Sequence, residues 1–205
     1  MQKPYWHLSG FYFVYFASLG ALIPFWSVYL NHLQFDSLEI GLLMSTLALS
    51  KIVAPYPWGW IADRSGFHIR IVQLTSLMSL VCFLPLLWLD GFWMMLGCML
   101  LFSFFWNASL PQFEVVTFSY LKERVARYAR IRVWGSIGFI ATVMLLGGLV
   151  EWRGPEVVLP AVLFIFLAIW LSSMLVRDPD PEPHPPDQQS LGSILRRRAI
   201  IGFFL

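Results

Sequence analysis

Three charged side chains stand where a charge is costly. Lys51 and Glu114 each interrupt a long uncharged stretch of the sequence, and Arg132 stands at the start of another. At the centre of a bilayer, a lysine or arginine costs about 2.5–3.5 kcal/mol on insertion scales, so such residues face a water-filled cavity or a counter-charge. A side chain of this kind typically binds a solute, carries a proton or pairs with another charge.

Glu114 and Arg132 are candidates for a pair. They lie at equal distances along the chain from Glu123, in the middle of a short connection. In an antiparallel helical hairpin, equal distances from the turn place two side chains at the same depth, where opposite charges can neutralise one another. A substrate-binding pair, a structural ion pair and an Arg132 side chain that snorkels to the headgroups all fit this pattern.

Lys51 lies equally far from Glu39 and Asp63, near the middle of a predicted span. Three roles fit: a partner for Glu114, a binding point for an anionic substrate, or a lock within the bundle. Asn107 lies two helical turns before Glu114, so both side chains can face one cavity. The scattered histidines and cysteines show no metal-ligand spacing, so neither a metal nor a cofactor is expected.

The composition indicates the elements that must position these residues. Apolar residues make up 58% of the 205 residues and charged residues only 13%, against about a quarter in a soluble domain. A soluble chain of this length cannot bury so much apolar surface. No basic run with interleaved aromatic residues occurs, so a nucleic-acid partner is not expected. The chain is predicted to be an all-α membrane protein in a lipid bilayer.

A bilayer core about 30 Å thick takes about 20 helical residues. Six stretches meet this length, at 8–30, 39–61, 71–89, 93–118, 132–150 and 157–176. The connections between them are short, which predicts that consecutive helices are antiparallel neighbours.

The basic residues set the predicted orientation. With the N-terminus in the cytoplasm, that side receives Lys3, Arg64, Arg70, Lys122, Arg124, Arg127, Arg130, Arg132, Arg177, Arg196, Arg197 and Arg198, whereas the other side receives only Arg153. Loops rich in lysine and arginine stay in the cytoplasm. A multi-pass protein with a cytoplasmic N-terminus is therefore predicted.

Three segments divide the chain. Residues 1–177 are expected to form a six-helix transmembrane bundle, and 178–198 a proline-rich cytoplasmic linker. Residues 199–205 begin another apolar run that reaches only about a third of a bilayer. The chain is therefore expected to be the first half of a longer protein.

The connection after the second span carries a motif, Gly59-Trp-Ile-Ala-Asp63-Arg64-Ser-Gly66-Phe-His68-Ile-Arg70. Its glycines permit a tight turn, and its charges can pair with neighbouring spans and latch one conformation. The motif resembles the signature between the second and third helices of the major facilitator superfamily, although Phe67 and His68 stand where two basic residues are usual. The resemblance implies a conformational latch at Gly59, Asp63, Arg64, Gly66 and Arg70. An ordinary basic membrane anchor with a glycine turn is the alternative.

Three further stretches narrow the resemblance. Residues 107–114 and 129–139 are similar to the lactose-permease-like and phenylpropionate-permease-like branch of proton symporters, and residues 15–30 resemble the first helix of the phenylpropionate-permease-like group. The resemblance implies the N-terminal six-helix bundle of a twelve-helix fold, with Glu114 and Arg132 as substrate-binding residues. Phe139 occupies the place of a sugar-stacking tryptophan of the lactose-permease-like branch. This change argues against galactoside recognition but keeps an aromatic face.

These features predict half of a secondary transporter that works by alternating access. The expected partners are a small organic solute such as an aromatic acid, sugar or nucleoside, protons, and the missing C-terminal six-helix half, which is expected to carry the proton-binding residues. A bacterial cytoplasmic membrane is the expected location. A truncated or homodimeric six-span protein without transport is one alternative.

An intramembrane enzyme is a remote alternative. A rhomboid-type protease needs Gly-x-Ser-Gly and a membrane histidine. The nearest string, Gly135-Ser-Ile-Gly138, has the wrong order, and the sixth span contains no histidine. The protein is therefore not expected to be an enzyme.

Overall fold

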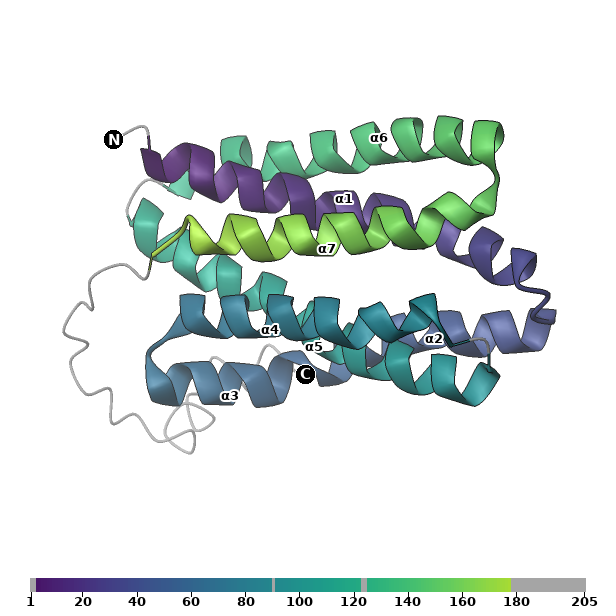
Figure 1. Ribbon diagram of the computed structural model, residues 1–205. Helices are drawn as coiled ribbons and strands as arrows, with labels where there is room; N and C mark the ends of the chain where they lie inside the picture. Colours follow the sequence, from purple (N-terminus) through teal and green to yellow (C-terminus); the bar gives the residue numbers. More distant parts are fainter. Residues whose placement is uncertain (1–2, 90, 123–124, 178–205) are drawn as a thin grey trace, which may run out of the picture.

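The computed structural model describes residues 3–89, 91–122 and 125–177, which are almost entirely helical (Figure 1). The helices are α1 (Lys3–His32), α2 (Ser37–Val53), α3 (Pro55–Ser65), α4 (His68–Phe83), α5 (Phe92–Leu121), α6 (Tyr128–Arg153) and α7 (Val158–Met174), with 3-10 turns at Leu84–Leu87, Val125–Arg127 and Pro155–Val157. Within this part of the chain, 6 helical segments are apolar and long enough to cross a membrane. The all-α fold with six predicted spans is confirmed.

The second span is interrupted at Pro55. It runs over Ser37–Ser65, but α2 ends before Ala54 and α3 begins at Pro55. Proline has no N–H to donate and its ring clashes with the preceding turn, so it interrupts the helical ladder. At the other end of α2, Asp36 and Glu39 form a reciprocal capping box that fixes where the helix starts.

The predicted linker at 178–198 and the predicted start of a seventh span at 199–205 lie outside the described residues. The division into bundle, linker and seventh span therefore stays a prediction.

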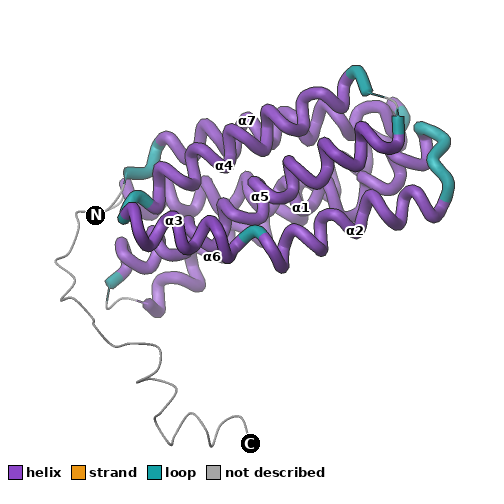
Figure 2. The backbone as a smooth tube through the Cα atoms, turned by 90° about the horizontal axis from the view of Figure 1, so that it is seen from below, coloured by secondary structure: helices purple, strands orange, loops and turns teal. Residues whose placement is uncertain are grey.

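The helices do not pack in the order of the chain. α1 lies along α6 and against α7, whereas α5 packs with α4 and α2, and α4 also meets α7 (Figures 1 and 2). Of the consecutive spans, only α4 and α5 pack extensively, so the prediction that consecutive helices are neighbours is wrong for most of the bundle. Short connections fix an antiparallel direction, but the faces that carry small and complementary side chains decide which helices meet.

Two glycines bring α1 and α6 into backbone contact. A Cβ atom at Gly20 would lie 2.7 Å from the carbonyl oxygen of Phe139, and one at Gly138 would overlap the carbonyl of Phe13. Gly135 similarly leaves room for the ring of Phe16. Small residues at a helix interface are a common way to bring membrane helices together. These contacts fix the position of α6 on α1.

Hydroxyl groups join α5 to its neighbours. Ser103 Oγ lies 2.7 Å from Ser50 Oγ of α2, and Ser109 Oγ lies 2.9 Å from Thr75 Oγ1 of α4. All four side chains are buried. Interhelical hydrogen bonds of this kind contribute roughly 0.6 kcal/mol each in membrane proteins. They hold α5 between α2 and α4.

Adding a side chain at Gly138 is expected to disrupt the bundle. The substitution Gly138→Val places methyl groups against the Phe13 backbone, and overpacking of this kind costs about 1–3 kcal/mol or more. Thermal unfolding of the purified protein, followed by size-exclusion chromatography in detergent, should show a lower midpoint or loss of the monodisperse peak. Gly148→Ala on the same helix is the control, because a Cβ there meets no atom within 4 Å. A Gly138→Val protein as stable as the control would contradict the close contact.

Candidate functional site

A cavity of about 450 Å³ lies between α1, α2, α5 and α6. Its polar lining consists of Lys51, Asn107 and Arg132, so the cavity brings together three side chains that the sequence analysis selected. Its aromatic lining consists of Tyr15, Phe16 and Trp106, and leucine, alanine, isoleucine and proline side chains line the rest. The site is therefore largely apolar with two cations, a composition suited to a small solute with one charged end.

Arg132 is half-buried at the start of α6 and its guanidinium lies over an aromatic ring. The guanidinium carbon is 3.7 Å from the ring centre of Phe16 and 5.9 Å from that of Tyr12. Stacking on an aromatic face holds a guanidinium in one plane and leaves its N–H groups free to bind at the edges. Because Gly135 lies beside Arg132 Nη1, a larger residue there would displace the side chain.

Lys51 lies in the last turn of α2, where its side chain lines the cavity and is exposed rather than packed against other residues. The one ion pair found in the described part of the chain joins His32 and Glu156 at 3.8 Å, away from the cavity. Neither Lys51 nor Arg132 is thus neutralised by a described carboxylate within 4.0 Å. A direct ion pair of Lys51 with Glu114 is therefore absent from the described structure.

Glu114 does not line the cavity. Its Oε1 accepts a hydrogen bond of 3.1 Å from the hydroxyl of Tyr128 at the start of α6, and it forms no ion pair with Arg132 within 4.0 Å. Glu114 and Arg132 were candidates for a pair because both were predicted to lie at the same depth in the membrane. α5 and α6 touch only slightly, so equal depth does not bring these side chains into contact.

Asn107 faces the cavity, unlike Glu114 on the same helix. Its Nδ2 donates to the backbone oxygens of Ser103 at 2.9 Å and Leu47 at 3.4 Å. These bonds tie α5 to α2 and orient the amide, which leaves its oxygen as the group available to a solute. The expectation that Asn107 and Glu114 face one cavity is therefore not met. The cavity lining on α5 includes Asn107 and Pro111 but not Glu114.

The aromatic wall is built by α1 and α5 rather than by Phe139. Tyr15 and Trp106 stack with ring centres 5.5 Å apart and an interplanar angle of 15°. The hydroxyl of Tyr15 donates to the backbone oxygen of Trp106, and Trp106 Nε1 donates to Ser18 Oγ at 3.1 Å. Phe139 is absent from the cavity lining, and its backbone packs on Gly20. Stacking and two hydrogen bonds therefore hold the two rings of the wall in this orientation.

The motif at 59–70 forms the end of α3 and the turn into α4. Gly66 ends α3 with φ of 72°, a left-handed conformation that favours glycine. Asp63 and Arg64 are exposed, and neither has an ion-pair partner within 4.0 Å among the residues described. The two arginines of the motif lie over aromatic rings instead, Arg64 over Trp60 and Arg70 over Phe67. The latch remains a prediction.

One contact of this motif was not predicted. His68 Nδ1 lies 2.9 Å from Oε1 of Gln112, and Gln112 Nε2 lies beside Gly59. Gln112 directly follows Pro111, a cavity residue. The turn is therefore connected through one side chain to the helix that lines the cavity.

Sequence reasoning also missed Tyr128, which binds Glu114, and Tyr15, which forms part of the aromatic wall. Tyr128, at the start of α6, stands where a tyrosine is usually an interfacial residue, and Tyr15 is one of many aromatic residues within an apolar helix. Neither position carries a sequence signal that distinguishes these roles.

Comparison with known proteins agrees with this architecture. The profile of the MFS_1 like family matches residues 5–205. The chain belongs to the MFS_1 like family. A probable 3-phenylpropionic acid transporter of Escherichia coli (strain K12) is 29% identical over 202 residues, which cover 94% of this chain and 50% of that protein. The maltose permease of Geobacillus stearothermophilus is 28% identical over 195 residues, covering 92% and 48%.

Solved structures share the fold of this MFS_1 like chain. The crystal structure of the nucleoside transporter NupG superposes with a TM-score of 0.78 at 20% sequence identity, covering 100% of this chain and 51% of that one. The chain spans about half the length of the relatives it matches. Its fold is that of the N-terminal half of a major facilitator superfamily transporter, a multi-pass integral membrane protein.

Cysteine labelling tests whether water reaches the cavity. In full-length protein with Cys82 and Cys98 replaced by alanine, Ala48→Cys should react with a charged thiol reagent at least about tenfold faster than Ser50→Cys, because a thiol reacts as an accessible thiolate. Ala48 lines the cavity. Ser50, on the same helix as Ala48, is instead buried against Ser103 of α5. Equal labelling rates, measured by mass spectrometry over time, would contradict the position of the cavity.

Proposed function

We propose that the protein is a secondary transporter of a small organic anion, an aromatic or arylalkyl carboxylic acid, and that this chain contributes the half-site built by Lys51 and Arg132. One observation carries the proposal. Both cations line one cavity of about 450 Å³ together with a stacked aromatic wall, and neither has a carboxylate partner among the described residues.

The charge of the cavity favours an anion. Two cations that share one cavity repel each other, and a carboxylate between them removes that repulsion. At 4 Å, one such attraction is worth about 4 kcal/mol at an effective dielectric of 20, before the cost of desolvation. Arg132, held flat on Phe16, is suited to donate two N–H groups to one carboxylate. Lys51 would act as a point charge on the opposite side.

The aromatic wall favours a flat apolar body. The stacked rings of Tyr15 and Trp106 and the edge of Phe16 offer contacts that are worth about 0.5–1.5 kcal/mol per aromatic pair beyond burial. The Escherichia coli relative is named for 3-phenylpropionic acid, which has a carboxylate and a phenyl ring. The name of the maltose permease suggests a neutral sugar as that protein's solute. The many hydroxyl groups of a sugar would find few hydrogen-bonding partners here, because the cavity lining is largely apolar.

The transport cycle would follow from the position of the site. In secondary transporters, sites at the interface of two helical bundles are exposed alternately as the bundles rock. A bound carboxylate would neutralise the two cations and so permit closure around the solute. Glu114, held by Tyr128 outside the cavity, would contribute to proton coupling rather than to binding. The cytoplasmic membrane of a bacterium, with the N-terminus inside, is the proposed setting.

Removing the cavity cations should abolish transport of an aromatic acid. Arg132→Ala or Lys51→Met in the full-length protein should weaken binding of 3-phenylpropionate about ten- to a hundredfold, since a hydrogen bond to a charged group is worth about 1.5–3 kcal/mol. Uptake of radiolabelled acid into proteoliposomes and its binding constant would be measured together. Arg132→Lys should recover part of the binding because it restores the charge but not the planar fork.

Two comparison variants make this experiment specific. Arg153→Gln removes an arginine at the opposite end of α6 and should leave both binding and uptake unchanged. Glu114→Gln should keep binding and exchange of the acid but lose accumulation against a gradient. Normal uptake by both Arg132→Ala and Lys51→Met would refute the proposed anion site.

A further inference from the structure

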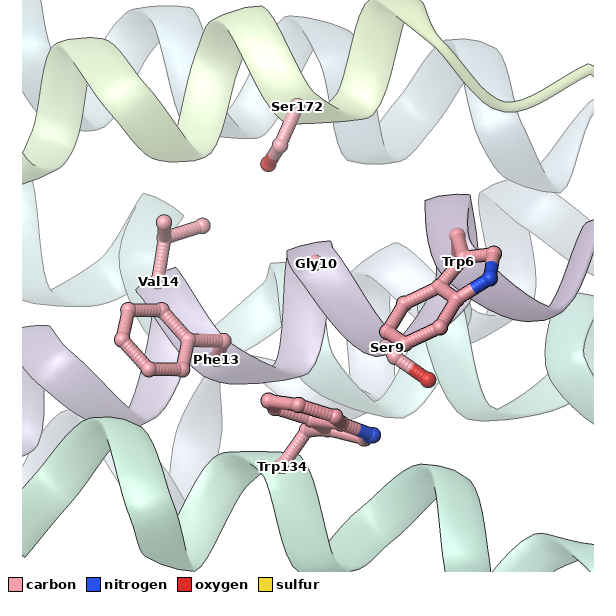
Figure 3. A pocket seen from close by; sticks show the side chains of 7 residues that line it. All are labelled: Trp6, Ser9, Gly10, Phe13, Val14, Trp134 and Ser172. Atoms are coloured by element: carbon pink, nitrogen blue, oxygen red, sulfur yellow. The ribbon is translucent and has the colours of Figure 1, made fainter. Parts of the chain in front are cut away.

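A second hollow lies on the outer side of the bundle. It has a volume of about 300 Å³ and is lined by residues of α1, α6 and α7, among them Trp6, Ser9, Phe13, Trp134 and Ser172 (Figure 3). α6 and α7 touch each other only slightly, so the groove between them reaches down to α1. We refer to it as the α6–α7 groove.

The groove faces away from the solute cavity. At 100° per residue, Trp134 and Arg132 point to opposite sides of α6, and the first lines the groove whereas the second lines the cavity. Gly10 and Leu19 are likewise opposed on α1, two and a half turns apart. A solute in the cavity therefore does not reach the groove, and the groove opens toward the surroundings of the bundle.

The walls of the groove suit an acyl chain that lies alongside two tryptophan rings, those of Trp6 and Trp134. Trp6 is 58% exposed, and its ring meets that of Trp134 edge to face at 5.6 Å. Trp134 Nε1 donates to the hydroxyl of Tyr5 at 3.1 Å. Tryptophan rings in this setting lie at the level of the lipid headgroups. The groove thus begins at the headgroup level and continues into apolar surface.

Polar groups in the groove are incompletely satisfied. Ser9 is 2% exposed, and its Oγ has no hydrogen-bond partner among the residues that the structure describes. A buried hydroxyl without a partner costs about 1–3 kcal/mol. Ser172 points from α7 across the gap toward α1 (Figure 3). The Ser172 hydroxyl already donates to the backbone oxygen of Ile169 at 2.8 Å. Ser9 is therefore the hydroxyl in the groove that remains available to donate to an ester oxygen of a lipid.

The charge at this end of the groove is positive. Arg130 lies one turn before Trp134, on the same face of α6, and Arg177 lies just beyond the end of α7. Both are exposed, and neither forms an ion pair within 4.0 Å with a described residue. In the predicted orientation this end faces the cytoplasmic leaflet, where anionic headgroups attract each nearby arginine by about 1 kcal/mol.

We propose that the α6–α7 groove binds one anionic phospholipid, with its phosphate at Arg130 and Arg177 and an acyl chain lying in the groove beside the Trp6–Trp134 pair. Phe13 connects this site to the fold, because its side chain lines the groove while its backbone contacts Gly138. A bound acyl chain therefore packs against the contact that holds α6, and with it Arg132, on α1.

Lipid binding to the purified full-length protein tests this proposal. Native mass spectrometry would be used to titrate phosphatidylglycerol and phosphatidylcholine with identical acyl chains, and the first should be retained preferentially. Arg130→Gln should weaken phosphatidylglycerol binding about fivefold, the equivalent of about 1 kcal/mol, and should weaken phosphatidylcholine binding less, because the choline cation already offsets the attraction of its phosphate to the arginine. Gly10→Leu should reduce phosphatidylglycerol binding by filling the groove, because a Cβ at Gly10 meets no atom within 4 Å and the side chain can be accommodated.

Matched variants serve as controls. Arg153→Gln, at the other end of α6, and Gly148→Leu, at an exposed glycine with open space around it, should leave phosphatidylglycerol binding unchanged. Equal retention of the two lipids by the unmodified protein would overturn the proposal. Unchanged phosphatidylglycerol binding in both Arg130→Gln and Gly10→Leu would overturn it as well.

Discussion

Backbone contact between α1 and α6 sets the position of both surfaces to which we assign a ligand. Gly20 and Gly138 allow each helix to approach the carbonyl groups of the other. This contact places Phe16 under the Arg132 guanidinium on one side and Phe13 in the groove on the other. Membrane helices gain no hydrophobic driving force by leaving lipid, so close packing of this kind must supply much of the association energy.

The cost of burying charge determines which solute the cavity favours. Lys51 and Arg132 have no described carboxylate within 4.0 Å, and Glu114 is bound to Tyr128 instead. Intramembrane cations without partners are expensive, and a solvated cavity that awaits an anion is the arrangement that reduces this cost. The aromatic wall then selects the body of the solute, because its rings are held by hydrogen bonds and stacking rather than free to adapt.

Hydropathy predicted the six spans, and the cost of an intramembrane charge predicted that Lys51 faces either a cavity or a counter-charge. Asn107 and Arg132 also line the cavity, but they were selected by their positions relative to Glu114, which does not line it. Hydropathy and the cost of charge could not predict which helices are neighbours, because the α1–α6 contact depends on where glycines meet backbone in three dimensions. Distance from a turn fixes depth but not direction around a helix, and Glu114 accordingly lies outside the cavity. Trp26 is buried with its Nε1 3.2 Å from the sulfur of Met99, and hydropathy cannot distinguish such a position from one that faces lipid, because the protein core and lipid are equally apolar.

The central claim is that the cavity recognises a carboxylate next to an aromatic ring. Isothermal titration of the full-length protein with 3-phenylpropionate and with its neutral amide tests this directly, because the two solutes share a shape and differ in charge. We predict that the acid binds at least about tenfold more tightly than the amide, as expected for the loss of a charged hydrogen-bonded pair. Equal affinities, or tighter binding of the amide, would contradict the account.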